Sequence, residues 1–150
     1  MNRDMAVEVD GLRADPSELL RSAGLRVTAP RVAVLTELAA FPHCDVDTLS
    51  RVTRQRLGSV STQAVYDVLR VLTSHGLVRR FEPAGQPARY EINASDNHHH
   101  LVCRVCGAFA DVECAAGRRP CLDVVDSHGF VIDEAEVLYW GTCPECTTTH

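Results

Sequence analysis

Apolar residues in the first half of the chain recur at helical spacing, in segments separated by short polar breaks. A residue type that commonly caps helices stands before each segment: Asp15, Thr28, Asp45 and Ser61. The pattern predicts helices over residues 16–23, 29–40, 46–57 and 62–75. The fourth is the most clearly amphipathic, because Val65, Leu69 and Leu72 fall on one side of it.

The segment that follows the fourth helix has the pattern of a β-hairpin. Residues 77–81 and 89–92 are typical of strands, and the turn between them is rich in Pro and Gly. Helices followed by such a hairpin form a winged helix, in which the helix after Ser61 would enter the major groove of DNA. We therefore expect a winged helix-turn-helix DNA-binding domain over residues 1–93, with 1–14 as a flexible lead-in.

Residues 94–150 have mixed periodicity. Strands are expected around 101–105 and 109–112, a short helix over 121–128 and a further strand over 130–140. A unit this small buries little apolar surface, so dimerisation is expected. The predicted fold class is α/β (α+β): a winged helix followed by a small α/β dimerisation domain with a four-cysteine zinc site.

Charge is distributed unevenly between these halves. Residues 1–93 hold 12 Arg and 11 acidic residues, whereas residues 94–150 hold 3 Arg and 9 acidic residues, and Lys is absent. Arg suits phosphate and guanine, although a solvated surface explains the charge equally well. On the fourth helix the residues not needed for the core are candidates for DNA contact: Ser61, Thr62, Gln63, Tyr66 and Arg70.

Apolar runs fall short of the roughly 18 residues of a membrane span, and the acidic N-terminal stretch has no signal-peptide core. We therefore expect a cytoplasmic protein without a membrane partner.

Cysteine and histidine spacing predicts metal binding. The pairs Cys103/Cys106 and Cys143/Cys146 form two CxxC motifs 36 residues apart, and four thiolates favour structural Zn²⁺. Thioredoxin-type redox disulfides are the alternative, but the sequence lacks the βαβ context that they need. Just before the first motif, His98 and His100 alternate along an expected strand and point the same way.

Five motifs in order resemble the ferric uptake regulator family: residues 23–31, Ala64-Val65-Tyr66, Arg89-Tyr90-Glu91, the run from His98 to Cys106 and the terminal CxxC. Further motifs, including Asp96-Asn97 before the histidines and Tyr139-Trp140-Gly141, are most similar to the actinobacterial branch, whose members repress catalase-peroxidase genes and often their own gene.

This resemblance implies a repressor and not an enzyme. It implies a homodimer that binds AT-rich palindromic operators in double-stranded DNA and takes no small-molecule substrate. Arg26 would reach the minor groove, with Arg31 close by in the same motif.

The resemblance also implies a regulatory Fe²⁺ or Mn²⁺ at the hinge between the domains, with ligands His43, Glu91, His98, His100 and Asp111. A mixed nitrogen and oxygen shell suits these ions better than a thiolate shell does. In peroxide sensors of the family the iron reacts with hydrogen peroxide and a ligating histidine is oxidised, which makes His43 and His98 the expected targets.

The accessory metal site of many family members would draw on Asn97, His99, Arg118 and Ala135, of which three are poor ligands. We therefore expect that site to be absent, and His99 to be a surface residue or a neighbour of the regulatory site. Of the remaining cysteines, Cys114 and Cys121 are candidates for a thiol switch, which is the alternative sensing mechanism. Cys44 has no assigned role.

Two other classes of function remain to be weighed. A small zinc hydrolase would need three ligands and an open water position, which His98, His100 and Glu91 could imitate. It would leave the winged helix without a purpose. A metal store would show labile metal and no specific DNA binding.

Overall fold

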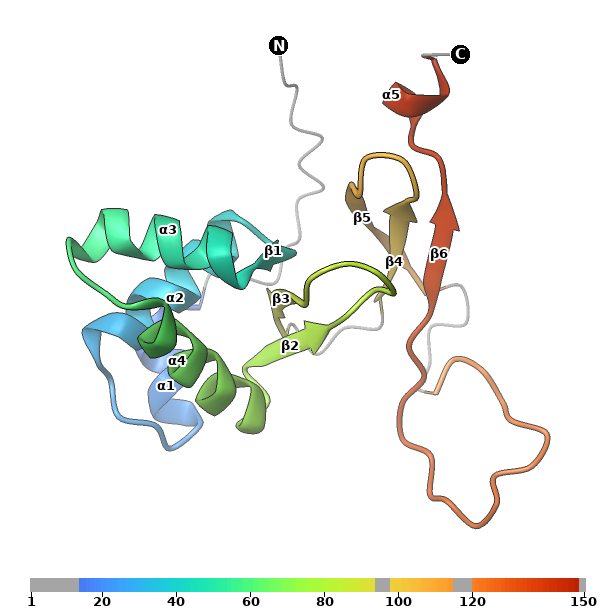
Figure 1. The fold of residues 1–150 in the computed structure, drawn as a ribbon. Coiled ribbons are helices and arrows are strands. Elements are labelled where there is room, and N and C mark those ends of the chain that lie inside the picture. The colour runs from blue at the N-terminus through green and yellow to red at the C-terminus, as the bar shows by residue number, and fades with distance from the viewer. Residues whose placement is uncertain (1–13, 94–97, 115–119, 149–150) are drawn as a thin grey trace. The chain divides into compact units, whose positions relative to one another are not determined.

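Helices α1 (Pro16–Ser22), α2 (Ala29–Ala40), α3 (Val46–Leu57) and α4 (Thr62–Ser74) follow one another in the first part of the chain (Figure 1). Each begins after its expected cap: side chains of Asp15, Thr28, Asp45 and Ser61 accept hydrogen bonds from the N–H groups of Ser17, Arg31, Thr48 and Ala64. These bonds satisfy N–H groups that have no partner within the helix. The four predicted helices are therefore confirmed.

The computed structural model describes residues 14–93, 98–114 and 120–148. The chain divides into two compact units, Met1–Ala94 and Ser95–His150. The predicted lead-in lies outside the described residues apart from Ala14. The assignment of DNA binding to the first unit and dimerisation to the second stays a prediction.

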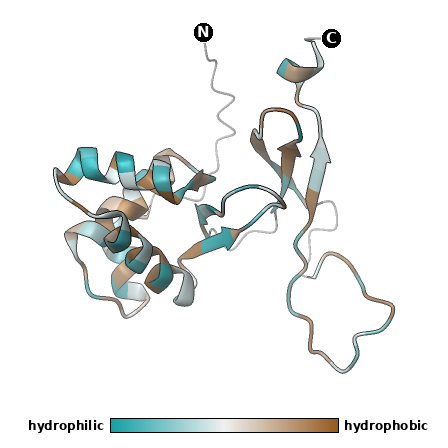
Figure 2. Ribbon diagram, in the orientation of Figure 1, coloured by the Kyte–Doolittle hydropathy of each residue, from teal (hydrophilic) through white to brown (hydrophobic). Residues whose placement is uncertain are grey.

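The core of the first unit lies between the helices. Val65, Leu69 and Leu72 of α4 are at most 1% exposed and pack in one cluster with residues of α2 and α3 such as Leu35 and Leu49. Each helix carries both apolar and polar positions, which Figure 2 shows as brown beside teal. Burial of the apolar side drives helix packing and leaves the polar side of α4 to solvent.

The predicted hairpin is present as β2 (Val78–Phe81) and β3 (Arg89–Ile92), paired antiparallel. A short strand that the sequence pattern did not predict, β1 (Cys44–Asp45), pairs with the other edge of β3, so the strand order is β1-β3-β2. This pairing brings the loop before β1 beside the middle of β3.

The second unit contains the strands β4 (His98–Cys103), β5 (Phe109–Glu113) and β6 (Leu138–Gly141) and the short helix α5 (Pro144–Thr147). The sheet order is β5-β4-β6, with β5 antiparallel and β6 parallel to the central strand. The histidine run thus forms the start of the central strand.

Two expectations for the second unit are wrong. Residues 121–128 form no helix, and only Leu138–Gly141 of the strand expected over 130–140 is a strand. Asp126 accepts a hydrogen bond from the His128 N–H at 2.8 Å, and His128 and Gly129 adopt positive φ angles of 50° and 82°. This local turn competes with a helix. Most apolar residues of this segment are exposed, so a helix here would bury little apolar surface against the described part of the unit.

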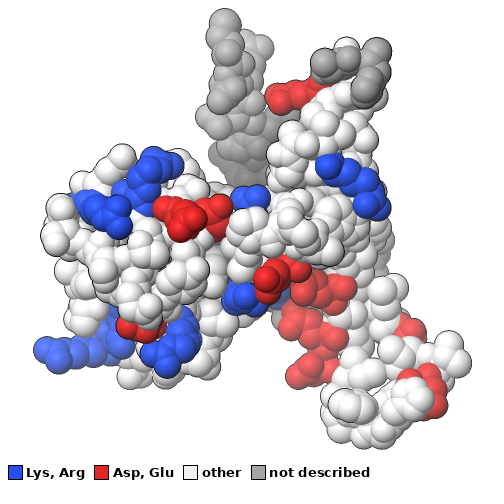
Figure 3. Space-filling model, viewed as in Figure 1, with Lys and Arg blue, Asp and Glu red and all other residues white. Residues whose placement is uncertain are grey.

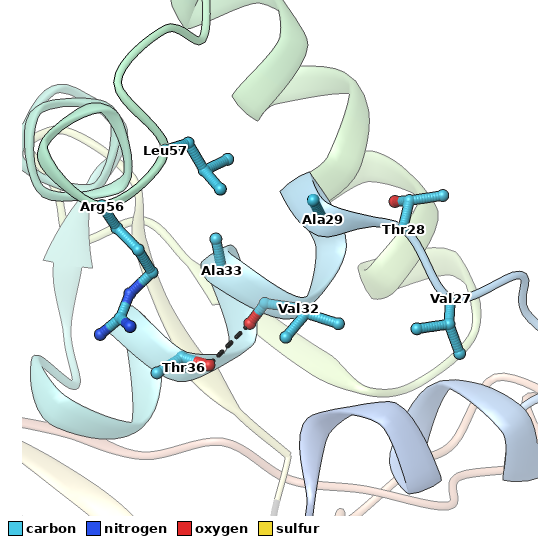
Figure 4. Close-up of a pocket in the computed structure, with 8 residues that line it drawn as sticks. All are labelled: Val27, Thr28, Ala29, Val32, Ala33, Thr36, Arg56 and Leu57. Carbon is cyan, nitrogen blue, oxygen red and sulfur yellow. Dashed lines mark hydrogen bonds between the residues drawn. The ribbon is translucent and has the colours of Figure 1, made fainter.

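A hollow of about 350 Å³ lies beside α2 and α3 (Figure 4). Its lining is mostly apolar, and its polar groups are already engaged: the Thr36 hydroxyl donates to the Val32 carbonyl at 2.8 Å, and Arg56 pairs with the buried Glu37. We therefore treat it as a feature of helix packing. Among the described residues, no helix is long and apolar enough to cross a membrane.

The α3 cap makes the stability of the first unit depend on pH. The Thr48 N–H donates to Asp45 at 2.8 Å and lowers the pKa of that carboxyl group. A depressed folded-state pKa gives stability that is present above the unfolded pKa of about 3.9 and is lost as pH falls through the folded value. We expect Asp45→Ala to lower the free energy of unfolding by about 1 kcal/mol at pH 7.

Asp45→Asn is the matched variant, because Asn caps a helix without a charge. Its deficit relative to the wild type should be smaller than that of Asp45→Ala and should shrink below about pH 4. Urea unfolding between pH 3 and pH 7 measures both effects. Equal stability of Asp45→Ala and wild type would contradict the role of the cap.

Candidate metal centres and nucleic-acid interface

The four cysteines of the two CxxC motifs are brought together by the parallel pairing of β4 and β6. Cys103 ends β4 opposite Gly141 of β6, and Cys143 follows two residues later. Gly107, with a φ of 74°, lets the chain turn back after Cys106 and donate its N–H to the Cys103 carbonyl at 3.0 Å. The thiols of the four residues, Cys103, Cys106, Cys143 and Cys146, lie within 4.8 Å of one another.

This spacing fits a tetrahedral ion. The Sγ atoms of Cys106 and Cys143 are 3.7 Å apart, close to the ~3.8 Å edge of a tetrahedron with Zn–S bonds of about 2.3 Å. Backbone N–H groups of Cys106 and Cys143 lower the pKa of the Cys103 thiol to about 6. Hydrogen bonding with the Cys143 and Cys106 side chains raises the pKa of Cys146 to about 12. The Cys146 thiol thus keeps its proton beside the other thiols, and a divalent cation bound by the four residues would displace that proton.

A histidine and a carboxylate meet at the edge of the first unit. Cys44 of β1 lies opposite Tyr90 of β3, so His43 and Glu91 become neighbours. The His43 Nε2 is 3.2 Å from the Glu91 Oε2, and both side chains are largely buried, with exposures of 12% and 5%. His43 is therefore not a solvent-exposed loop residue.

The backbone of His43 has a φ of 64°, a left-handed conformation that costs a non-glycine residue energy. Two hydrogen bonds hold it: its N–H donates to the Tyr90 carbonyl at 3.0 Å, and its carbonyl accepts from Arg89 at 3.3 Å. Arg79, opposite Glu91 on β2, places a guanidinium nitrogen 3.9 Å from the Glu91 Oε1. Contacts with strands β2 and β3 therefore fix the positions of His43 and Glu91.

The second unit carries its own set of nitrogen and oxygen donors. His98 and His100 lie on one face of β4, and their rings meet at a centroid distance of 5.0 Å. Asp111 of β5 is opposite His100, with its Oδ1 3.8 Å from the His98 Nε2 and 3.5 Å from the His100 Nε2. The predicted orientation of the two histidines is confirmed. Imidazole and carboxylate donors of this kind suit Fe²⁺ and Mn²⁺.

His99 points to the other face of the same strand, and it is not a surface residue: it is 3% exposed. Its Nε2 is 3.1 Å from the Cys121 Sγ, and the donor atoms of His99, Cys114 and Cys121 lie within 4.8 Å of one another. Sequence spacing did not predict this group, because Cys121 approaches from a segment without helix or strand. The accessory site of other family members, which we expect to be absent here, would also use the positions of Asn97 and Arg118. Both lie outside the described residues.

The polar side of α4 presents the predicted DNA-contact residues. Ser61, Gln63, Tyr66 and Arg70 are exposed, and Thr62 is half-buried. Asp67 lies between two of them, accepting from Gln63 at 3.3 Å and from Arg70 at 3.4 Å. Earlier in the chain, the guanidinium of the half-buried Arg31 donates to the carbonyl of the exposed Arg26 at 2.8 Å. Figure 3 shows several Arg patches on this unit.

An open groove of about 690 Å³ runs along α4 and the hairpin. Gln63, Tyr66 and Arg70 line it together with Arg80 of β2, which the sequence reasoning did not single out. Its position on the hairpin was the available signal, because wing residues commonly meet the DNA backbone in this architecture.

Comparison with known proteins identifies the family. The model of the ferric uptake regulator family matches residues 22–139, which is most of the chain. The chain belongs to the ferric uptake regulator family. Members are transcriptional regulators, so the prediction that the chain is not an enzyme is confirmed, and so is the resemblance on which it rested.

Relatives in this family include two kinds of regulator. The chain is 57% identical over 133 residues to the transcriptional regulator FurA of Mycobacterium tuberculosis strain H37Rv, covering 89% of this chain and 90% of that protein. It is 26% identical over 151 residues to the peroxide-responsive repressor PerR of Staphylococcus aureus, covering 95% and 98%.

Solved structures agree with the fold. The ferric uptake regulator of Pseudomonas aeruginosa with manganese has a TM-score of 0.69 at 27% identity, over 87% of this chain and 99% of that one. The Helicobacter pylori ferric uptake regulator also has a TM-score of 0.69, at 22% identity, over 87% of each chain. The predicted α+β fold class is confirmed, and the chain is a metal-responsive transcriptional regulator of this family.

Loss of one thiol should remove the four-cysteine metal site. We expect Cys143→Ser to lose one tightly bound Zn²⁺ per chain and to unfold at a lower temperature, because a structural ion contributes folding free energy directly. Metal analysis and thermal unfolding measure this. Cys44→Ala is the matched control: burial raises the pKa of Cys44 to about 11, which keeps it a thiol, and its zinc content should not change. Unchanged zinc in Cys143→Ser would contradict the assignment.

Proposed function

We propose that the chain is a metal-dependent transcriptional repressor that binds operator DNA as a homodimer, with one Fe²⁺ or Mn²⁺ per chain as the regulatory ion. The observation that carries the proposal is the division of hard donors between the units. His43 and Glu91 form a pair in the first unit, and His98, His100 and Asp111 form a group in the second.

Neither group is a complete shell by itself. Fe²⁺ and Mn²⁺ commonly take about six ligands, whereas the pair offers two side chains and the group offers three. Five ligands on one shared ion would leave a position for water. Such an ion would tie the units together and hold the two α4 helices of a dimer at the spacing of one operator.

The donors also have the chemistry that such an ion needs. His100 is fully buried and Glu91 is 4% exposed, and a buried carboxylate is costly unless a cation or hydrogen bonds compensate it. Arg79 supplies part of that compensation at 3.9 Å. A divalent ion held by the Glu91 and His43 side chains would add positive charge beside this buried carboxylate and stabilise it further.

DNA recognition is assigned to α4 and the Arg residues around it. Gln63 can pair with adenine, and Tyr66 can contact a thymine methyl group or a phosphate. Arg70 and Arg31 would meet the phosphate backbone, while Arg26 would enter a narrow, AT-rich minor groove. Ser61 and Thr62 place hydroxyl groups at the helix N-terminus, where the helix dipole favours phosphate.

Dimerisation is assigned to the second unit. Val125, Phe130 and Val131 are 108%, 76% and 97% exposed in the single chain. Exposed apolar residues gathered in one segment are typical of protein interfaces. A second copy of the chain would cover them.

The signal is proposed to be peroxide or iron supply, and the targets a catalase-peroxidase gene and the regulator's own gene. The relatives support this: one is a FurA and another is named a peroxide-responsive repressor. Bound Fe²⁺ would supply reactivity toward hydrogen peroxide at this site. His43 and His98 hold nitrogen donors there and are the expected sites of oxidation. A repressor acting on chromosomal DNA works in the cytoplasm.

Metal-dependent DNA binding tests the proposal. Fluorescence anisotropy with the chain's own promoter should show at least about tenfold tighter binding with Mn²⁺ than without metal. His100→Ala should abolish this gain. His128→Ala, which removes an exposed histidine of the same unit, should keep it.

Affinity should also fall steeply with salt, as phosphate contacts require. Equal affinity with and without Mn²⁺ in the wild type, under conditions in which the protein is folded, would sink the proposed function.

A thiol switch at Cys114 and Cys121 is the second candidate, because their Sγ atoms lie within 4.8 Å. Two thiols would lose two electrons and two protons to hydrogen peroxide, which becomes two waters as the disulfide forms.

The double variant Cys114→Ser/Cys121→Ser separates the two mechanisms. With Fe²⁺ bound, peroxide should release the double variant from DNA as readily as it releases the wild type. Mass spectrometry should then find one added oxygen on His43 or His98. With Mn²⁺ in place of Fe²⁺, release should be much slower. Loss of peroxide release in the double variant would favour the thiol switch instead.

A further inference from the structure

We propose that His99, Cys114 and Cys121 form a further metal site, suited to Zn²⁺, on the face of the β4–β5 sheet opposite to His98 and His100. The site lies wholly within the second unit. It uses residues that neither the four-cysteine centre nor the regulatory ligand set employs, and it does not depend on DNA binding.

Strand geometry explains why these donors meet. Successive side chains of a strand point to opposite faces, so His99 leaves the face that His98 and His100 share. His99 is opposite Val112 of β5, and Cys114, two residues beyond Val112, therefore follows the same face at the end of that strand. Cys121 completes the group, with its Sγ 3.1 Å from the His99 Nε2.

The distances are those of ligands that could share one ion. All three donor atoms lie within 4.8 Å of one another. Ligand atoms around tetrahedral Zn²⁺ are separated by roughly 3.3–3.8 Å, given Zn–N bonds of about 2.0 Å and Zn–S bonds of about 2.3 Å. To reach that geometry the 3.1 Å separation between the Cys121 Sγ and the His99 Nε2 would widen by a few tenths of an ångström, and any separation near 4.8 Å would shorten.

The donor types select the ion. Two thiolates and one imidazole favour Zn²⁺ over Fe²⁺ or Mn²⁺, which the harder donors on the other face accommodate better. His99 is 3% and Cys121 9% exposed, whereas Cys114 is half-buried. The site therefore has a closed side and a side open to solvent, where water can take the fourth position.

This site is separate from the four-cysteine centre. His99 and Cys103 are four residues apart on β4, which corresponds to about 13 Å at roughly 3.3 Å per residue. The two sites therefore share no ligands, and the second unit has room for two thiolate-bound ions.

An ion here would fasten an otherwise irregular segment to the sheet. Residues 120–137 contain no helix or strand, and the Cys121 thiol lies 3.9 Å from the Ala135 carbonyl, so both ends of the segment approach the same place. Holding Cys121 against β4 would fix this segment and also the backbone of His99, whose two chain neighbours are the proposed regulatory ligands.

Metal stoichiometry of the full-length protein, purified under reducing conditions without DNA, tests the proposal. The wild type should retain two thiolate-bound Zn²⁺ per chain after dialysis, and Co²⁺ substitution should give two equivalents of sulfur-to-cobalt charge-transfer absorption. Cys121→Ser and His99→Gln should each retain one. Cys44→Ala, which removes a buried thiol of the other unit, should retain two.

A second measurement needs no variant. Iodoacetamide labelling followed by mass spectrometry should find Cys114 and Cys121 protected when Zn²⁺ is present and labelled after a chelator removes it. The proposal would be overturned if the wild type held only one Zn²⁺ per chain and Cys114 and Cys121 were labelled to the same extent with and without Zn²⁺. A Cys114–Cys121 disulfide in protein kept reduced would overturn it as well.

Discussion

The alternation of side chains along β4 is the constraint on which the metal chemistry of this chain depends. Three consecutive histidines look equivalent in sequence, but a strand sends the middle one to the opposite face from its neighbours. His98 and His100 therefore meet Asp111, whereas His99 meets Cys121. One strand thus separates hard donors from soft ones, and its last residue, Cys103, supplies one thiol of the four-cysteine cluster.

In the first unit, pairing between strands positions the donors in a comparable way. The two-residue strand β1 adds to the edge of β3 and brings His43 to 3.2 Å from Glu91. The left-handed backbone of His43 costs energy that its hydrogen bonds to Tyr90 and Arg89 offset. Capped helices around a shared core hold that sheet, so the His43–Glu91 pair and the exposed side of α4 belong to one packed body.

Much of the fold could be predicted from local sequence signals. Caps at Asp15, Thr28, Asp45 and Ser61 marked the starts of four helices. The family resemblance indicated a set of regulatory ligands that the spacing of residues in the sequence could not have grouped. The contacts between His43 and Glu91 and between His99 and Cys121 depend on strand pairing and chain return, which local patterns do not encode. The helix expected over 121–128 failed because apolar periodicity was present without a surface to bury it, and a turn at Asp126 competed.

The central proposal is that one Fe²⁺ or Mn²⁺ ion takes ligands from both units. Titration of Mn²⁺ into the protein under anaerobic conditions, with free Mn²⁺ followed by electron paramagnetic resonance, tests it most directly. The account predicts one tight site per chain, which both His43→Ala and His100→Ala abolish although they lie in different units. Full Mn²⁺ affinity in His43→Ala would show that the second unit binds the ion alone and would contradict the account.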